Sequence, residues 1–65
     1  MYRIQVFNPN GKLNHTIKRR DWRALTARIA YGKAIRENPE RIVELQFTSS
    51  ENFDWITLLT EGRLN

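Results

Sequence analysis

Two prolines and an Asn-Gly pair divide this chain into three segments, and the middle one carries apolar residues at helical spacing. These residues lie between Asp21, whose carboxylate can cap the first amides of a helix, and Pro39, which a helix does not continue through. We therefore predict a helix from Trp22 to about Glu37. At 100° per residue, its expected buried stripe consists of Trp22, Leu25, Ile29 and Gly32, flanked by Ala24 and Ile35.

Alternating apolar and polar residues predict four strands around this helix. Asn10-Gly11 supplies the positive φ angles that a tight hairpin turn between the first two strands requires. The strands are expected at Tyr2 to Phe7, about Lys12 to Ile17, Arg41 to Thr48, and Phe53 to Leu59. The side chains expected to point inward are Tyr2, Ile4 and Val6, then Val43, Leu45 and Phe47, and finally Phe53, Trp55 and Leu59. In the second strand, Leu13, His15 and Ile17 are expected to share one face, with His15 partly exposed.

The order ββαββ predicts an α+β two-layer sandwich, in which one helix covers one face of a four-stranded, mostly antiparallel sheet. Residues 1–60 are expected to form this single domain, and residues 61–65 a loose tail. A chain of 65 residues without cysteine has one small core and no disulfide to reinforce it. We therefore expect self-association, as a homodimer or a higher oligomer.

Two sets of residues are candidates for self-association. On the helix, three alanines at three- and four-residue spacing permit close packing of another element, although alanine is also the best helix former; they are Ala27, Ala30 and Ala34. On the sheet face away from the helix, the strand phases leave four apolar side chains uncovered, namely Phe7, Ile42, Ile56 and Leu58. A shifted strand phase or a bulge would instead bring one of these four inward.

Positive charge is concentrated in one segment. Seven of the eleven basic residues fall within residues 18–36, where Asp21 is the only acid, so this segment carries +6 and the rest of the chain −2. Such a field attracts phosphates or acidic protein surfaces, although the same charges also keep a small domain soluble. The predicted contacts to an anionic partner are Lys18, Arg19, Arg20, Arg23, Arg28, Lys33 and Arg36.

The sequence contains no recognisable catalytic arrangement. His15 has no partner at a spacing that suggests acid-base catalysis, the carboxylates are scattered, and no glycine-rich loop opens a helix. With one histidine and no cysteine, a histidine or thiolate metal site is not expected. We therefore predict a non-enzymatic protein with neither a metal nor a cofactor.

The expected function is that of a small inhibitor-like binding protein, which uses its basic helix face to occupy an acidic surface of a protein or of nucleic acid. Tyr31 is the one aromatic side chain expected on the exposed helix side, where it could stack on a base, whereas Trp22 and Trp55 are expected in the core. This scarcity of exposed aromatics favours a protein partner. The alternative is a homo-oligomer that binds a nucleotide-like phosphorylated small molecule between subunits, with Tyr31 or a tryptophan against the base.

No apolar run approaches the roughly 20 residues that a membrane span needs. The first residues lack the apolar core and cleavage site of a signal peptide. We therefore expect no contact with a membrane and a cytoplasmic location.

Overall fold

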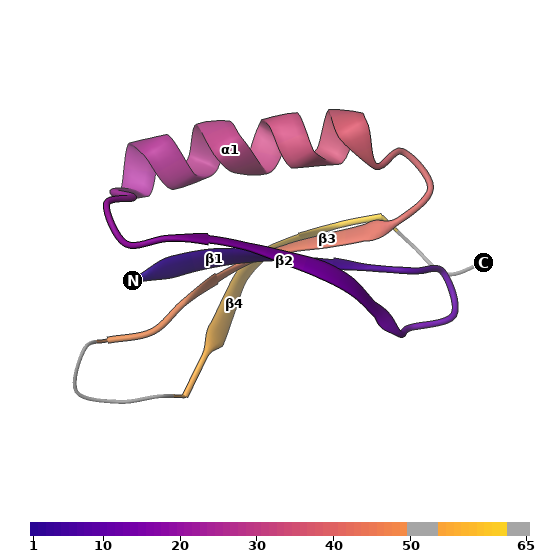
Figure 1. Ribbon diagram of the computed structural model, residues 1–65, viewed down its shortest axis with the longest axis horizontal. Helices are drawn as coiled ribbons and strands as arrows, with labels where there is room; N and C mark the ends of the chain where they lie inside the picture. Colours follow the sequence, from indigo (N-terminus) through magenta and orange to yellow (C-terminus); the bar gives the residue numbers. More distant parts are fainter. Residues whose placement is uncertain (50–53, 63–65) are drawn as a thin grey trace.

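The computed structural model describes residues 1–49 and 54–62, which form four strands and one helix in the order ββαββ. The elements are β1 (Tyr2–Phe7), β2 (Leu13–Arg19), α1 (Ala24–Glu37), β3 (Ile42–Phe47) and β4 (Ile56–Glu61). Every strand pair is antiparallel, and the sheet order is β2-β1-β3-β4. The helix lies along one face of the sheet and packs on the two central strands, β1 and β3 (Figure 1). The predicted α+β sandwich is confirmed.

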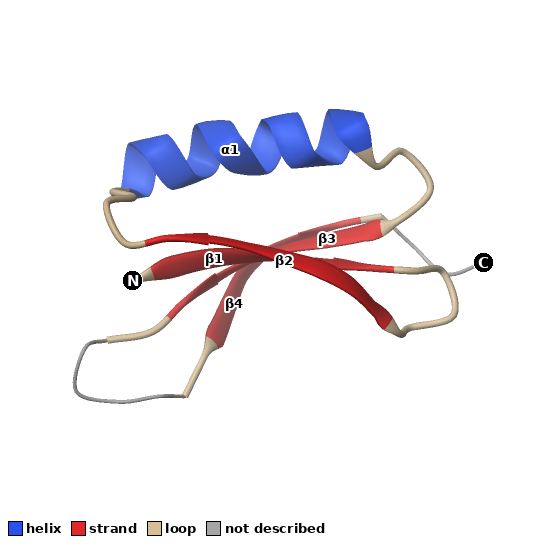
Figure 2. Ribbon diagram, viewed as in Figure 1, coloured by secondary structure: helices blue, strands red, loops and turns tan. Residues whose placement is uncertain are grey.

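The turn between β1 and β2 forms where the Asn-Gly pair predicts it. Gly11 has a φ of +88°, and its amide donates a hydrogen bond of 2.8 Å to the carbonyl oxygen of Asn8. The side chain of Asn10 accepts a hydrogen bond of 3.0 Å from the amide of Lys12. This turn fixes the register of the hairpin, so that β1 and β2 form one half of the sheet (Figure 2).

The core lies between the central strands and the helix. Ile4 and Val6 of β1 are fully buried, and Val43 and Leu45 of β3 are each only 1% exposed. These residues alternate with more accessible ones along each strand, which confirms the predicted phases of β1 and β3. The helix contributes Ala27, Tyr31 and Ala34.

The predicted buried face of the helix is wrong. Leu25 and Ile29 are 73% and 65% exposed, while the face that carries Ala27 and Tyr31 contacts the sheet. The central strands already fill the interlayer space with branched side chains, so the helix packs through small residues that allow a close approach. Leu25 and Ile29 consequently lie on the solvent side.

The start of the helix also differs from the prediction. Arg23 is the N-cap residue and makes no side-chain capping hydrogen bond, whereas Asp21 lies in the preceding turn. Trp22 therefore precedes the helix, although it still packs, half-buried, against the core. The helix ends after Glu37 as expected, where the buried Asn38 side chain donates a hydrogen bond of 2.9 Å to the carbonyl oxygen of Ala34.

A bulge in the β3–β4 pair changes which way β4 points. Leu45 pairs with Leu59, but the next residue, Gln46, pairs with Thr57, so Leu58 has no partner in the register. Directly paired residues of antiparallel strands share a face. Ile56, paired with Phe47, therefore lies on the helix side of the sheet, where Leu58 also lines a groove with Ala24 and Arg28 of α1.

The prediction that Ile56 and Leu58 project from the far face is thus wrong, and the alternative of a bulge is correct. Phe53, which was expected to point inward, lies outside the described residues.

A second register shift, between Val6 and Phe7, pairs Leu13 with Phe7 and moves Leu13 away from the face of His15 and Ile17. At the other end of β4, Glu61 pairs with Val43, so the sheet extends one residue beyond the expected domain boundary.

Candidate anion-binding site

All seven predicted contact residues are exposed, but they do not form one patch. Lys18 and Arg19 end β2, and Arg20 and Arg23 lie in the connection to the helix. The other three are spread along α1. At a rise of about 1.5 Å per residue, Arg36 lies roughly 20 Å along the helix axis from Arg23. The structure therefore keeps four of the seven together at the start of the helix.

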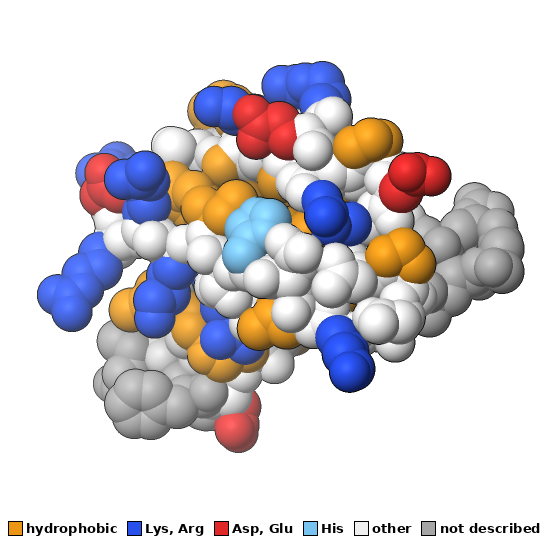
Figure 3. All heavy atoms as spheres, turned by 45° about the vertical axis from the view of Figure 1, so that its right-hand side comes forward, with side chains coloured by type: hydrophobic (Ala, Val, Ile, Leu, Met, Phe, Trp, Pro, Cys, Tyr) orange, Lys and Arg blue, Asp and Glu red, His pale blue; other side chains and the backbone are white. Residues whose placement is uncertain are grey.

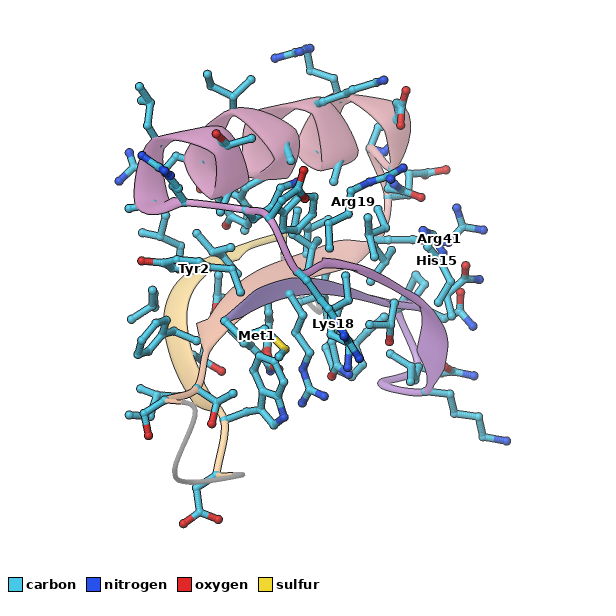
Figure 4. All side chains as sticks on the ribbon, turned by 60° about the vertical axis from the view of Figure 1, so that its left-hand side comes forward. Met1, Tyr2, His15, Lys18, Arg19 and Arg41 are labelled. Carbon is cyan, nitrogen blue, oxygen red and sulfur yellow. The ribbon has the colours of Figure 1, made fainter. Side chains whose placement is uncertain are left out.

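A fifth cation joins these four from β1. Arg3 pairs directly with Lys18, so both side chains leave the same face of the sheet. Arg19, the next residue of this edge strand, points to the opposite face, as Figure 4 shows for the labelled Lys18 and Arg19. Positive charge thus wraps around the end of β2. We call this set the basic end; it consists of Arg3, Lys18, Arg19, Arg20 and Arg23.

Sequence reasoning missed Arg3 because a single cation in a strand resembles ordinary surface charge. The signal was present in the hairpin, since a tight turn at Gly11 brings the first residues of β1 opposite the last residues of β2. In the space-filling view, several Lys and Arg side chains gather on the left of the molecule, with isolated cations elsewhere (Figure 3).

Trp55 is wrongly predicted as a core residue. It precedes β4, and the guanidinium carbon of Arg3 lies 4.0 Å from the centroid of its ring, with the Lys18 ammonium 5.9 Å away. Since Arg3 and Lys18 project from the face opposite the helix, the indole lies on that open face. Partial burial lowers the pKa of Arg3, but an arginine stays protonated at neutral pH.

A cleft of about 260 Å³ extends from the basic end along the other side of β2. Arg19 of β2 and Lys33 of α1 line it together, so the fold brings these two predicted cations to one cavity. Trp22 forms part of the wall, and Glu37 adds a carboxylate. The remaining lining residues are Ile17, Ala30 and Ala34.

The predicted role of Tyr31 in base stacking is excluded by its position. The side chain is 7% exposed, and its hydroxyl donates a hydrogen bond of 3.3 Å to the carbonyl oxygen of Val43. The helix is turned so that this face meets the sheet. The same rotation buries Ala27 and Ala34 and half-buries Ala30, so intramolecular packing occupies the alanine face that was a candidate for self-association.

Phe7 and Ile42 pair with each other on the face away from the helix, where the sequence predicts them, and both are half-buried. His15 is exposed in β2, and its Nδ1 lies 2.6 Å from the side-chain oxygen of Asn14. Within residues 1–49 and 54–62, no three His, Cys, Asp or Glu side chains gather in a way that could hold a metal ion. In the described part of the chain, residues 1–49 and 54–62, no helix is both long enough and apolar enough to cross a membrane.

Comparisons with protein-family models, curated proteins and solved structures give no match for this chain. Arginine guanidinium groups bind phosphate or carboxylate oxygens through two parallel hydrogen bonds, and lysine adds a compact positive charge. The basic end has the groups needed to hold an anion.

Proposed function

We propose that this protein is a non-enzymatic binding protein that occupies an anionic surface of a macromolecule through its basic end. In this proposal Arg28, Lys33 and Arg36 strengthen the long-range field, while the basic end makes the direct contacts. The protein acts in the cytoplasm, as the sequence predicts, and competes with other ligands of its partner in the manner of a small inhibitor.

The observation that carries this proposal is the meeting of five cations at one end of the sheet. They come from β1, from β2 and from the connection to α1. Asp21 is the only acid between Lys18 and Arg23, so the local charge is strongly positive. Fixed charges of one sign on a small surface raise both the association rate and the affinity for the opposite charge.

The test compares two double variants that change the net charge equally. Arg19→Glu with Arg20→Glu reverses charge at the basic end, whereas Lys12→Glu with Arg36→Glu reverses two exposed cations in the β1–β2 turn and near the end of the helix. Binding to heparin, a polyanion without bases or peptide, is measured by the salt concentration needed for elution. We expect a large loss for the first variant and a small one for the second. Equal losses would mean that net charge alone governs binding.

The second candidate is the binding of a nucleotide-like phosphorylated small molecule, and the cleft beside β2 favours it. Arg19 and Lys33 would bind the phosphates, and Trp22 would contact the base. This cleft lies within one chain, so the ligand would not need a second subunit. A nucleotide that binds there should raise the melting temperature of the protein, and the increase should grow with the ratio of nucleotide concentration to dissociation constant. A Lys33→Gln variant should lose that shift.

A further inference from the structure

The side chains on the open face of the sheet form ordered rows across the strands. At the basic end, the register aligns one residue from each strand, all on the face away from the helix. In sheet order these are Lys18, Arg3, Gln46 and Thr57. The neighbouring row is Thr16, Gln5, Glu44 and Thr60. The first row therefore combines two cations with neutral polar groups, and both cations lie over the ring of Trp55.

Arg3 is held in place in this row. Its Nε donates a hydrogen bond of 2.7 Å to the side-chain oxygen of Gln46, which is 8% exposed. The amide nitrogen of Gln46 in turn donates to Glu44 at 2.9 Å and to Thr57 at 3.4 Å. The guanidinium is thus fixed over the indole before any ligand arrives, which reduces the entropy that binding must cost.

The backbone just before Trp55 is also anchored. The hydroxyl of Thr48, the residue after β3, donates a hydrogen bond of 2.9 Å to the carbonyl oxygen of Asp54. The indole is only half-buried, so part of it remains accessible beside Arg3. An accessible indole with a guanidinium held over its ring offers aromatic surface and positive charge together, and on such a site an unpaired base can stack.

From this arrangement we infer that the partner is single-stranded nucleic acid, with a base stacked at Arg3 and Trp55 and the neighbouring phosphates bound by Lys18, Arg19 and Arg20. This inference rests on the proposed function and names its partner. It also reverses the preference for a protein partner, which depended on a scarcity of exposed aromatic side chains.

The charge of the two rows fixes where the strand would cross. Glu44 lies in the second row and accepts hydrogen bonds from Gln46 and Thr57, so its carboxylate opposes a phosphate in the middle of the face. Cations lie in the first row and continue around the edge strand β2 to Arg19. The backbone of the nucleic acid should therefore run across the end of the sheet and past the edge of β2, rather than along the strands.

Stacking distinguishes this partner from the other anions. The bases of a duplex are already stacked on one another, and the carboxylates of an acidic protein have no aromatic face. Binding of a single strand should therefore depend on Trp55 as well as on charge, whereas binding of the other two should depend on charge alone.

The experiment uses the full chain with Trp22→Phe, which leaves Trp55 as the single tryptophan. The probe is an oligothymidylate of about 12 nucleotides, a length within the range of single-strand sites. We expect it to quench the fluorescence of Trp55 on binding, while a duplex of equal length and poly-glutamate bind more weakly and quench little. Replacing Trp55 by Leu in the wild-type chain should weaken oligothymidylate binding by roughly ten-fold or more, and Trp55→Phe by less.

Two results would overturn the inference while leaving the proposed function intact: unchanged affinity in a folded Trp55→Leu variant, or preferential binding of poly-glutamate or duplex. If Trp55→Leu unfolds, the quenching in the Trp22→Phe protein decides the question, because that protein keeps the indole. Failure to bind any of these anions, together with unaltered heparin elution of the Arg19→Glu, Arg20→Glu variant, would overturn both proposals.

Discussion

Tyr31 combines a large apolar contact with a polar atom inside the core, and its hydroxyl has a partner there. Burial raises the pKa of this phenol above its ordinary value of 10.0; Glu61 and Glu44 raise it further, while Arg28 lowers it. The hydroxyl donates to the Val43 carbonyl, so the protonated form is the one that fits the fold. Tyr31 thus connects α1 to β3 by packing and by a hydrogen bond.

Replacing Tyr31 by Phe should lower the free energy of unfolding by about 1 kcal/mol at neutral pH, because the Val43 carbonyl loses its side-chain donor. In the wild type, the contribution of Tyr31 is fully present below pH 10. Above it, the unfolded phenol releases its proton while the folded phenol keeps it, so stability falls as the pH rises. Urea unfolding of both proteins at neutral pH and above pH 10 should show a shallower decline for Tyr31→Phe. An equal decline would contradict the raised pKa.

Along the strands, the sequence pattern is sufficient to predict most of the fold. Ile4, Val6, Val43 and Leu45 alternate regularly with polar residues, and a sheet converts that period directly into an inner and an outer face. The pattern fails in β4 because a bulge at Leu58 adds one residue, and β4 contains no glycine that would mark a bulge in advance.

The helix shows why hydrophobic size alone misleads. Leu25 and Ile29 are the large aliphatic residues of its first half, so a prediction based on side-chain hydrophobicity places them against the sheet. The sheet instead needs a helix surface small enough to approach closely, which Ala27 and Ala34 provide, while Tyr31 is the large helix residue that is buried with them. Which face of the helix packs on the sheet depends on the volume of the side chains on β1 and β3. The helix sequence by itself therefore does not predict that face.

Core packing of the helix can be tested by contrasting substitutions. Leu25→Ala and Ile29→Ala should each change the free energy of unfolding by no more than about 0.5 kcal/mol, as for other exposed sites. Ala27→Leu should lower it by about 1–3 kcal/mol, because the added carbons have no space against the sheet. Chemical denaturation of the three variants gives these values. A cost above about 2 kcal/mol for Leu25→Ala, with little cost for Ala27→Leu, would mean that the helix faces the other way.

For the candidate site, the sequence predicted four of the five cations of the basic end but not their grouping with Arg3. The segment from Lys18 to Arg23 is contiguous, so its charge was visible. Arg3 and Trp55 join it only through the pairing of β1 with β2 and through the path of the chain into β4. Contacts between residues this far apart in the chain depend on the tertiary fold.

For the whole molecule, self-association remains a prediction, and the fold changes which residues we expect to take part. Large apolar side chains remain exposed on β4, where Ile56 is 61% and Leu58 49% accessible, and β4 is an edge strand. A core this small gains stability from covering such a surface. We expect a native mass spectrum to show a dimer, and Leu58→Glu to shift it to a monomer. A wild-type monomer at all concentrations would contradict this expectation.

The salt dependence of oligothymidylate binding tests whether the basic end binds a polyanion. On a double-logarithmic plot, affinity should fall linearly with salt, with a slope of about 0.7 per phosphate neutralised. Replacing both Arg19 and Arg20 by Gln removes two cations without adding repulsion. We expect a weaker affinity and a slope shallower by about 1.4 for this variant. The same slope and affinity as the wild type would contradict binding at the basic end.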